Sequence, residues 1–206
     1  MVYQDFRNAF FDQICITNKL VQTWYPGFDK NNLGRWVNKG YLIKLRNGYY
    51  TFTEHTTIPN IQLYLSNRMY RPSYISLHTA LAFYGLIPES ISQITGVSTL
   101  KTAGFHNDTG TFSYKSIKHR LFFGYEQLAF QGEKTILMAT PEKAVIDLLY
   151  IYPFYNNEHE LSALRLDEDY LEENFNTNRF MKYLDEIKNL ALEKRGRLLL
   201  KTYSLK

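Results

Sequence analysis

The sequence of 206 residues contains a single cysteine, Cys15, and only 11 glycines and 6 prolines. One cysteine cannot form an internal disulfide and offers no metal-ligand spacing, so a reducing compartment is its natural location. With 45% hydrophobic residues, the composition excludes a disordered or collagen-like chain. The length predicts one large domain, or a small domain of about 50–70 residues attached to a larger one.

Long hydrophobic runs are also missing, since no stretch reaches the roughly 18 apolar residues that a membrane-spanning helix requires. The first residues, MVYQDFRNAF, carry acidic and polar side chains. A signal peptide would have a basic and then an apolar run in this place. We therefore expect a cytoplasmic protein without a membrane partner.

Motifs for catalysis, metal binding and phosphate binding do not occur. The five histidines are scattered, and there is no His-x-x-x-His, cysteine pair, glycine-rich phosphate loop or Gly-x-Ser-x-Gly turn. The one Glu-x-Lys, at Glu186–Lys188, falls in a predicted helix instead of a nuclease strand. Glu142 and Asp147 lie about 140° apart around another predicted helix, where helix-start and surface roles explain them more simply. We expect no enzyme, metal or cofactor.

The net charge of +4 is unevenly distributed. Residues 1–54 and residues 55–135 each hold seven Lys or Arg against four Asp or Glu, whereas residues 136–206 hold ten against twelve. The acidic residues are concentrated between Glu158 and Glu173. A basic front and a locally acidic back indicate two kinds of partner, although an ordinary solvated helix also explains the acidic stretch.

The first 55 residues predict three helices, over residues 3–12, 16–25 and 29–39. In the third, Asp29 is a suitable N-cap and Gly40 a suitable residue after the C-terminus.

The two faces of the third predicted helix differ sharply. Leu33, Trp36 and Val37 share one face at helical spacing, which predicts that this face is buried. A solvated face normally mixes charges of both signs. The other face here carries only amides and cations: Asn31, Arg35, Asn38 and Lys39.

A hairpin is predicted directly after this helix. Asn47-Gly48 separates two strand-like runs, residues 41–46 and 49–53, and predicts a type I′ turn with positive φ at both residues. Three helices and a hairpin predict a winged helix-turn-helix domain over residues 1–55. In the major groove, Arg35 would read guanine and an Asn adenine, with Lys44 and Arg46 beside phosphates or in the minor groove. Two alternatives are a winged helix that binds protein and a small domain that binds nothing.

The remainder predicts an α+β domain over residues 61–206, after a polar linker at residues 55–60. Ser76 and Gly85 mark the two ends of one helix, and Thr140-Pro141 begins another. Between them we predict an antiparallel meander of four strands, at residues 94–100, 111–117, 121–130 and 134–139. Helices are predicted around residues 159–173 and 178–194. Aromatic residues make up 16% of the chain, and core packing explains them better than base stacking.

Four segments together resemble the AbiEi-type antitoxins of type IV toxin–antitoxin (abortive infection) systems. They are WVNKGYLIKLRNGYYTF, PSYISLHTALAFYGLIPE, GTFSYKSIKHRLFFGY and ATPEKAVIDLLY, and the resemblance covers about residues 10–190. It implies an N-terminal winged helix that represses the chain's own operon. It also implies a C-terminal domain that opposes the effect of a nucleotidyltransferase-like toxin encoded by a neighbouring gene. A stable complex between the antitoxin and the toxin is not required.

Carried over by position, the resemblance assigns the contacts with double-stranded DNA to one helix and one hairpin: Lys30, Asn31, Arg35, Asn38, Lys39, Lys44, Arg46 and Asn47. These segments are only modestly basic, which favours cooperative binding at repeated operator sites. Two alternatives to an autoregulatory antitoxin remain. One is a protein-interaction module that docks through the basic 55–135 block or the acidic 158–173 stretch without binding DNA. The other is an enzyme on nucleic acid that depends on Glu142 or Asp147.

Overall fold

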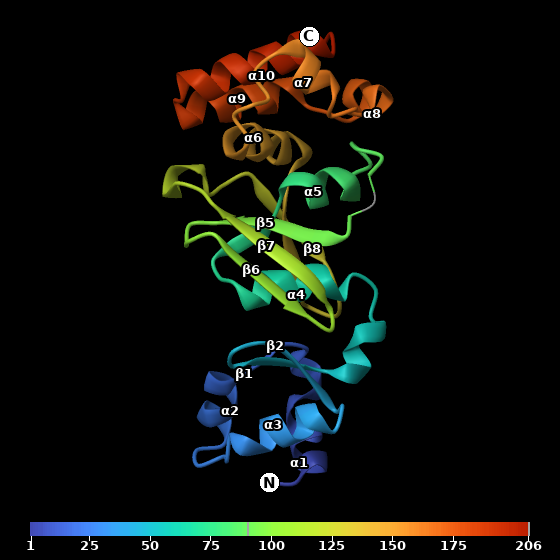
Figure 1. Ribbon diagram of the computed structural model, residues 1–206, viewed down its shortest axis with the longest axis vertical. Coiled ribbons are helices and arrows are strands. Elements are labelled where there is room, and N and C mark those ends of the chain that lie inside the picture. The colour runs from blue at the N-terminus through green and yellow to red at the C-terminus, as the bar shows by residue number, and fades with distance from the viewer. Residues whose placement is uncertain (90, 206) are drawn as a thin grey trace.

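The computed structural model describes residues 1–89 and 91–205 and combines helices with two β-sheets, so the chain has an α+β fold (Figure 1). The molecule is elongated, with the ends of the chain at opposite poles. Along its length lie an N-terminal part, defined here as residues 1–57, then a central sheet flanked by helices, and a layer of C-terminal helices. None of the helices in the described ranges has the length and apolarity needed to cross a bilayer.

The N-terminal part alternates helices with the strands of a small sheet. The chain order is α1 (Tyr3–Phe10), η1 (Phe11–Gln13), β1 (Ile16–Thr17), α2 (Asn18–Trp24), α3 (Asn31–Asn38), β2 (Leu42–Arg46), β3 (Tyr49–Phe52) and η2 (Thr53–Thr57). The sheet is antiparallel with the order β1-β3-β2.

The three predicted helices are present with shifted ends. The second begins at Asn18 instead of residue 16, because Ile16 and Thr17 pair with β3 and the Thr17 hydroxyl caps α2. Asp29 lies just before α3 and accepts a hydrogen bond from the Asn31 N–H at 2.9 Å. Gly40 ends α3 with a φ of +72°, as predicted.

The predicted hairpin is confirmed, but its turn differs from type I′. Of the two turn residues, only Gly48 has a positive φ, at +77°. A bulge between Lys44 and Arg46 takes up the difference in register, so the turn needs one left-handed residue instead of two.

The predicted antiparallel meander is wrong. The described residues of the second sheet form six strands in the order β6-β7-β5-β4-β9-β8, in which β5 pairs with β7, and β4 with β9, in parallel. The strands are β4 (Ser73–Ile75), β5 (Gln93–Ser98), β6 (Ala103–Asn107), β7 (Gly110–Ser116), β8 (Tyr125–Ala129) and β9 (Thr135–Ala139). The sequence did not predict β4 or β6. They reorder the sheet, because β6 forms the hairpin with β7 and β4 separates β5 from β9.

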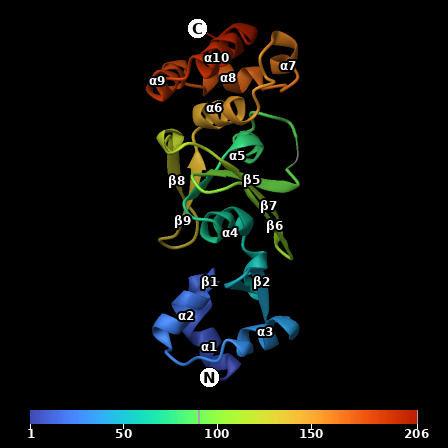
Figure 2. The ribbon, with the colours of Figure 1, turned by 60° about the vertical axis from the view of Figure 1, so that its left-hand side comes forward.

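Helices cover both faces of this sheet (Figures 1 and 2). On one face lies α4 (Ile61–Met69), and on the other lie α5 (Leu77–Phe83) and α6 (Pro141–Ile151). The Thr140 hydroxyl caps α6 and Pro141 is its first residue, as predicted. Gly85 follows α5 with a φ of +78°.

The C-terminal layer consists of the helices α7 (Glu158–Ser162), α8 (Glu168–Glu173), α9 (Thr177–Ile187) and α10 (Leu190–Thr202). Of these, α9 and α10 pack on α6, and α7 packs on α10. The predicted helix at 159–173 is interrupted at Arg165, which has a φ of +49°. The predicted helix at 178–194 is interrupted at Lys188, which adopts a left-handed conformation before Asn189 caps α10.

The described residues form two hydrophobic cores. The smaller one lies entirely within the N-terminal part and includes Phe6, Phe10, Trp36 and Phe52. The larger one fills the space around the second sheet and its helices, and it also takes in three residues of the N-terminal part: Ile14, Ile43 and Leu45. One face of β2 therefore packs against the larger part, and the division of the chain at residues 55–61 stays a prediction.

Candidate nucleic-acid interface

The helix α3 exposes the polar face that its sequence predicts. Asn31, Arg35, Asn38 and Lys39 are all exposed, and so is Lys30 just before the helix. On the opposite face Leu33 is 1% and Trp36 is 7% exposed, while Val37 is partly buried.

Aromatic packing holds α3 in place. The Trp36 ring lies 4.6 Å from Phe6, 5.6 Å from Tyr3 and 5.8 Å from Phe28, measured between ring centroids. Such pairs contribute beyond the area they bury. The exposed face of α3 is therefore presented on a rigid support near the free end of the N-terminal part (Figure 1).

The positive charge around α3 is not neutralised by neighbouring carboxylates. Within the described residues, Lys30, Arg35 and Lys39 form no ion pair. The Arg35 guanidinium instead donates to the Asn32 side chain at 3.1 Å. The carboxylate of Asp29 is engaged by the start of α3.

A surface groove runs along the same side of α3. Its volume is about 530 Å³, and its lining includes Tyr3, Arg35, Asn38, Lys39 and Tyr41. The Tyr3 and Tyr41 rings pack on each other with centroids 4.4 Å apart. The groove thus combines donor groups with an aromatic floor next to the face that α3 exposes.

The hairpin residues are placed differently from one another. Lys44 and Asn47 are exposed, whereas Arg46 is partly buried. The Arg46 guanidinium donates to the carbonyl of Met69 at 2.9 Å and lies over the rings of Tyr49 and Phe105. The structure therefore places Arg46 at the junction with the larger part, apart from the exposed face of α3.

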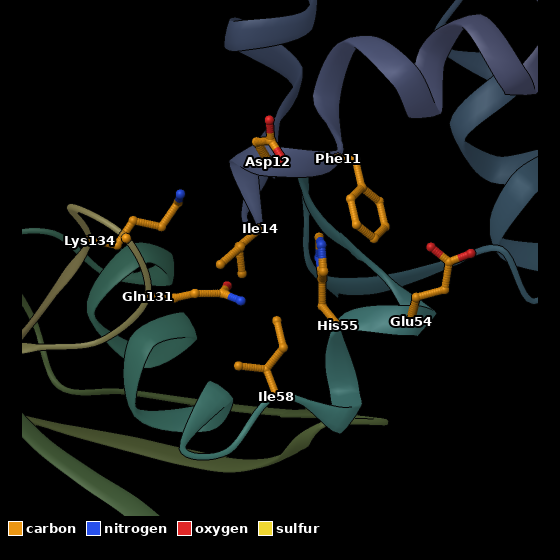
Figure 3. Close-up of a pocket in the computed structure, with 9 residues that line it drawn as sticks. Phe11, Asp12, Ile14, Glu54, His55, Ile58, Gln131 and Lys134 are labelled. Carbon is orange, nitrogen blue, oxygen red and sulfur yellow. The ribbon is translucent and has the colours of Figure 1, made fainter.

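A second cavity lies at that junction (Figure 3). Its volume is about 380 Å³, and it is lined by Phe11, Glu54 and His55 of the N-terminal part and by Gln131 and Lys134 of the loop between β8 and β9. His55, expected in a polar linker, is only 4% exposed and packs between the Phe11 and Phe52 rings. Burial lowers the pKa of His55. No group of His, Cys, Asp and Glu in the described residues is arranged to hold a metal ion.

Sequence reasoning missed a buried polar network beneath the second sheet. Lys143 and Asp147, one turn apart on α6, form an ion pair in which both side chains are 0% exposed. Asp147 also accepts hydrogen bonds from the hydroxyls of Tyr74, at 2.9 Å, and Ser76, at 2.8 Å. Ser76, expected to cap α5, therefore uses its hydroxyl for Asp147 instead.

Glu142 lies in the first turn of α6, as predicted, although it is only 1% exposed. The surface role expected for Asp147 is wrong, since its side chain is 0% exposed. Glu142 accepts a hydrogen bond from the Asn176 N–H at 2.9 Å and joins α6 to the start of α9. Burial raises the pKa of Tyr74 well above its ordinary value, with Asp147 adding to the effect. Burial also lowers the pKa of Lys143, against the opposing effect of Asp147. The Lys143–Asp147 pair therefore lies in the interior of the fold, where it joins α6 to Tyr74 of β4.

Comparison with known proteins adds no assignment. No family model matches the chain. No curated protein matches it either.

Proposed function

We propose that the chain is a DNA-binding transcriptional regulator whose residues 1–55 form a winged helix-turn-helix domain. The chain order α1-β1-α2-α3-β2-β3 and the antiparallel sheet order β1-β3-β2 support this proposal. In such a domain α3 is the recognition helix in the major groove, and the β2–β3 hairpin is the wing.

The exposed face of α3 is the observation that carries the proposal. Arg35 has the fork of donors that pairs with guanine, and Asn31 or Asn38 has the donor and acceptor that pair with adenine. Lys30 and Lys39 flank them and have no ion pair in the described chain. Unpaired cations of this kind favour binding to DNA phosphates, because each phosphate contact releases counterions that had been bound to the DNA.

A pair of arginine variants tests this proposal. In Arg35→Ala, affinity for the chain's own upstream DNA should fall by about 1–3 kcal/mol, and base preference should relax at one position. The matched control is Arg120→Ala, since Arg120 is also exposed but lies in the larger part; it should bind like the wild type. Equal affinity in Arg35→Ala and the wild type would refute the assignment of α3. Loss only in Arg120→Ala would favour a docking face on the larger part.

We further propose that the regulated operon encodes a nucleotidyltransferase-like toxin and that this chain is its antitoxin. The resemblance of the four sequence segments supports this second step. Co-expression in a bacterial host should restore growth that the neighbouring toxin gene arrests. Arg35→Ala should keep this rescue while losing repression, because rescue is assigned to the larger part. No rescue by the wild-type chain would refute the antitoxin role and leave the DNA-binding role standing.

A further inference from the structure

Two cavities at the edge of the central sheet share a pair of arginines. The first, of about 290 Å³, lies at the C-terminal end of α4 and beside strands β8 and β9. The second, of about 350 Å³, continues toward the N-terminal part and is lined by Tyr49 and Lys134. Arg68 and Arg71 line both cavities. A single ligand held by these arginines can therefore extend from one cavity into the other.

The chemistry of the lining is that of an anion site. Three cations, Arg68, Arg71 and Lys134, border the two cavities, and no Asp or Glu is among the described residues that line them. None of the three cations forms an ion pair within residues 1–89 and 91–205. Planar guanidinium groups bind phosphate through two parallel hydrogen bonds.

Two buried polar atoms at this site have no hydrogen-bond partner in the described chain, although the Arg68 guanidinium also lies over the Tyr64 ring. They are the Nε of Arg68 and the hydroxyl of Ser73, whose residue is only 3% exposed and lines the first cavity. Buried donors are almost always hydrogen-bonded in folded proteins. Both atoms therefore point to a polar ligand at this place.

An aromatic wall faces the same cavity. Phe122 and Tyr125 line it, and their ring centroids lie 5.4 Å apart. Tyr74 stacks behind Tyr125 at 4.8 Å, and its hydroxyl is fixed by Lys143 and Asp147. The buried network thus keeps the aromatic wall in position, and such a wall stacks well on a planar ring.

We propose that these cavities bind a nucleotide. Its base would lie against Phe122 and Tyr125, and its phosphates would contact Arg68 and Arg71 with the terminal phosphate toward Lys134. The cavities are close to the lower limit of small-ligand sites, about 300–1,000 Å³, which favours a mononucleotide over a nucleic-acid strand. This site is separate from α3, so it does not depend on DNA binding by that helix.

Calorimetric titration of the full chain with ATP and GTP, and with pyrophosphate and a short oligothymidylate, tests this inference. We expect a nucleotide to bind with a dissociation constant below about 1 mM. Arg71→Gln should weaken it at least roughly tenfold, because a charged phosphate contact is lost. Tyr125→Leu should weaken the binding of the nucleotide while leaving the affinity for pyrophosphate unchanged. The control Arg120→Gln should have no effect, and thermal unfolding of each variant shows that it is folded.

Three results would overturn the inference. They are the absence of nucleotide binding, binding that is unaltered in both Arg71→Gln and Tyr125→Leu, and binding of pyrophosphate as tight as that of the nucleotides. Binding of the oligothymidylate alone would assign the cavities to a nucleic-acid strand instead. Because no DNA duplex is present in these titrations, their failure would not bear on the role of α3.

Discussion

Neutralising one member of the buried Lys143–Asp147 pair should destabilise the protein strongly. In Asp147→Asn the Lys143 ammonium, which is 0% exposed, keeps the Tyr74 hydroxyl at 2.8 Å but loses its counter-charge. Breaking a buried ion pair in this way costs about 3–5 kcal/mol. Since the free energy of unfolding of native proteins is about 5–15 kcal/mol, this loss is a large part of the total stability. Lys143→Met should have a similar cost, because it leaves the Asp147 carboxylate uncompensated.

The double variant Lys143→Met/Asp147→Asn separates this explanation from a simple packing defect. It removes both charges, and the amide oxygen introduced at position 147 can still accept from the hydroxyls of Tyr74 and Ser76. Its cost should be smaller than the sum of the single costs by about 1–3 kcal/mol. Urea unfolding followed by circular dichroism measures all three values.

A surface pair with the same spacing provides the matched control. Arg197 and Glu193 also lie four residues apart on one helix, with side chains 59% and 29% exposed. Exposed pairs of this kind contribute about 0.3–0.5 kcal/mol, so Arg197→Met should have little effect. Equal costs for Asp147→Asn and Arg197→Met, or strictly additive costs in the double variant, would refute the reasoning about burial.

Three further predictions concern substitutions at five positions. Arg46→Ala should lower the free energy of unfolding by about 1–3 kcal/mol, because a partly buried charged hydrogen bond is lost. Lys44→Ala should leave stability unchanged and flatten the salt dependence of DNA binding by about one unit. The reverse pattern would contradict the placement of Arg46 and Lys44. In urea unfolding, Gly196→Ala should cost about 1–3 kcal/mol through overpacking, since an added Cβ would lie 2.5 Å from a Leu184 methyl carbon. Gly34→Ala should instead stabilise α3 by about 0.5–1 kcal/mol, because nothing lies within 4 Å of the Cβ that alanine would add at this exposed position. A destabilised Gly34→Ala variant would contradict the open surroundings of Gly34. Because burial lowers the pKa of His55, the folded state binds its proton less readily than the unfolded state, so stability should be retained above about pH 6.5 and decline below it. Unfolding at pH 7.5 and 5.5 should show a smaller decline in His55→Gln, and an unchanged decline would assign it to other groups.

Local signals in the sequence predicted the N-terminal part well. Helix periodicity around Leu33 and Trp36 and the glycine at position 40 each act over a few residues, and the structure follows them. The Asn47-Gly48 pair predicted the hairpin but not its turn type, since only Gly48 has a positive φ. The exposed face of α3 was predictable for the same reason, because helical spacing alone separates its two faces.

Long-range pairing explains what the sequence could not predict. The short strand β4 has three residues, and nothing local reveals that it pairs with β5 on one side and β9 on the other. The burial of Asp147 depends on Tyr74 and Ser76, which lie more than 70 residues earlier in the chain. The role of Arg46 at the junction likewise depends on Met69 and Phe105.

The salt dependence of binding to the chain's own upstream DNA tests the central claim most directly. Three candidate phosphate-binding cations, Lys30, Lys39 and Lys44, are exposed in the N-terminal part beside the base-reading Arg35. Three phosphate contacts give a slope of about −2.7 in log K against log salt, or roughly a 40-fold loss of affinity per protomer between about 50 and 200 mM salt. Fluorescence anisotropy should show this loss, together with tighter binding to the upstream sequence than to a scrambled one. A flat salt dependence, or equal affinity for both sequences at low salt, would contradict the proposal that α3 reads DNA.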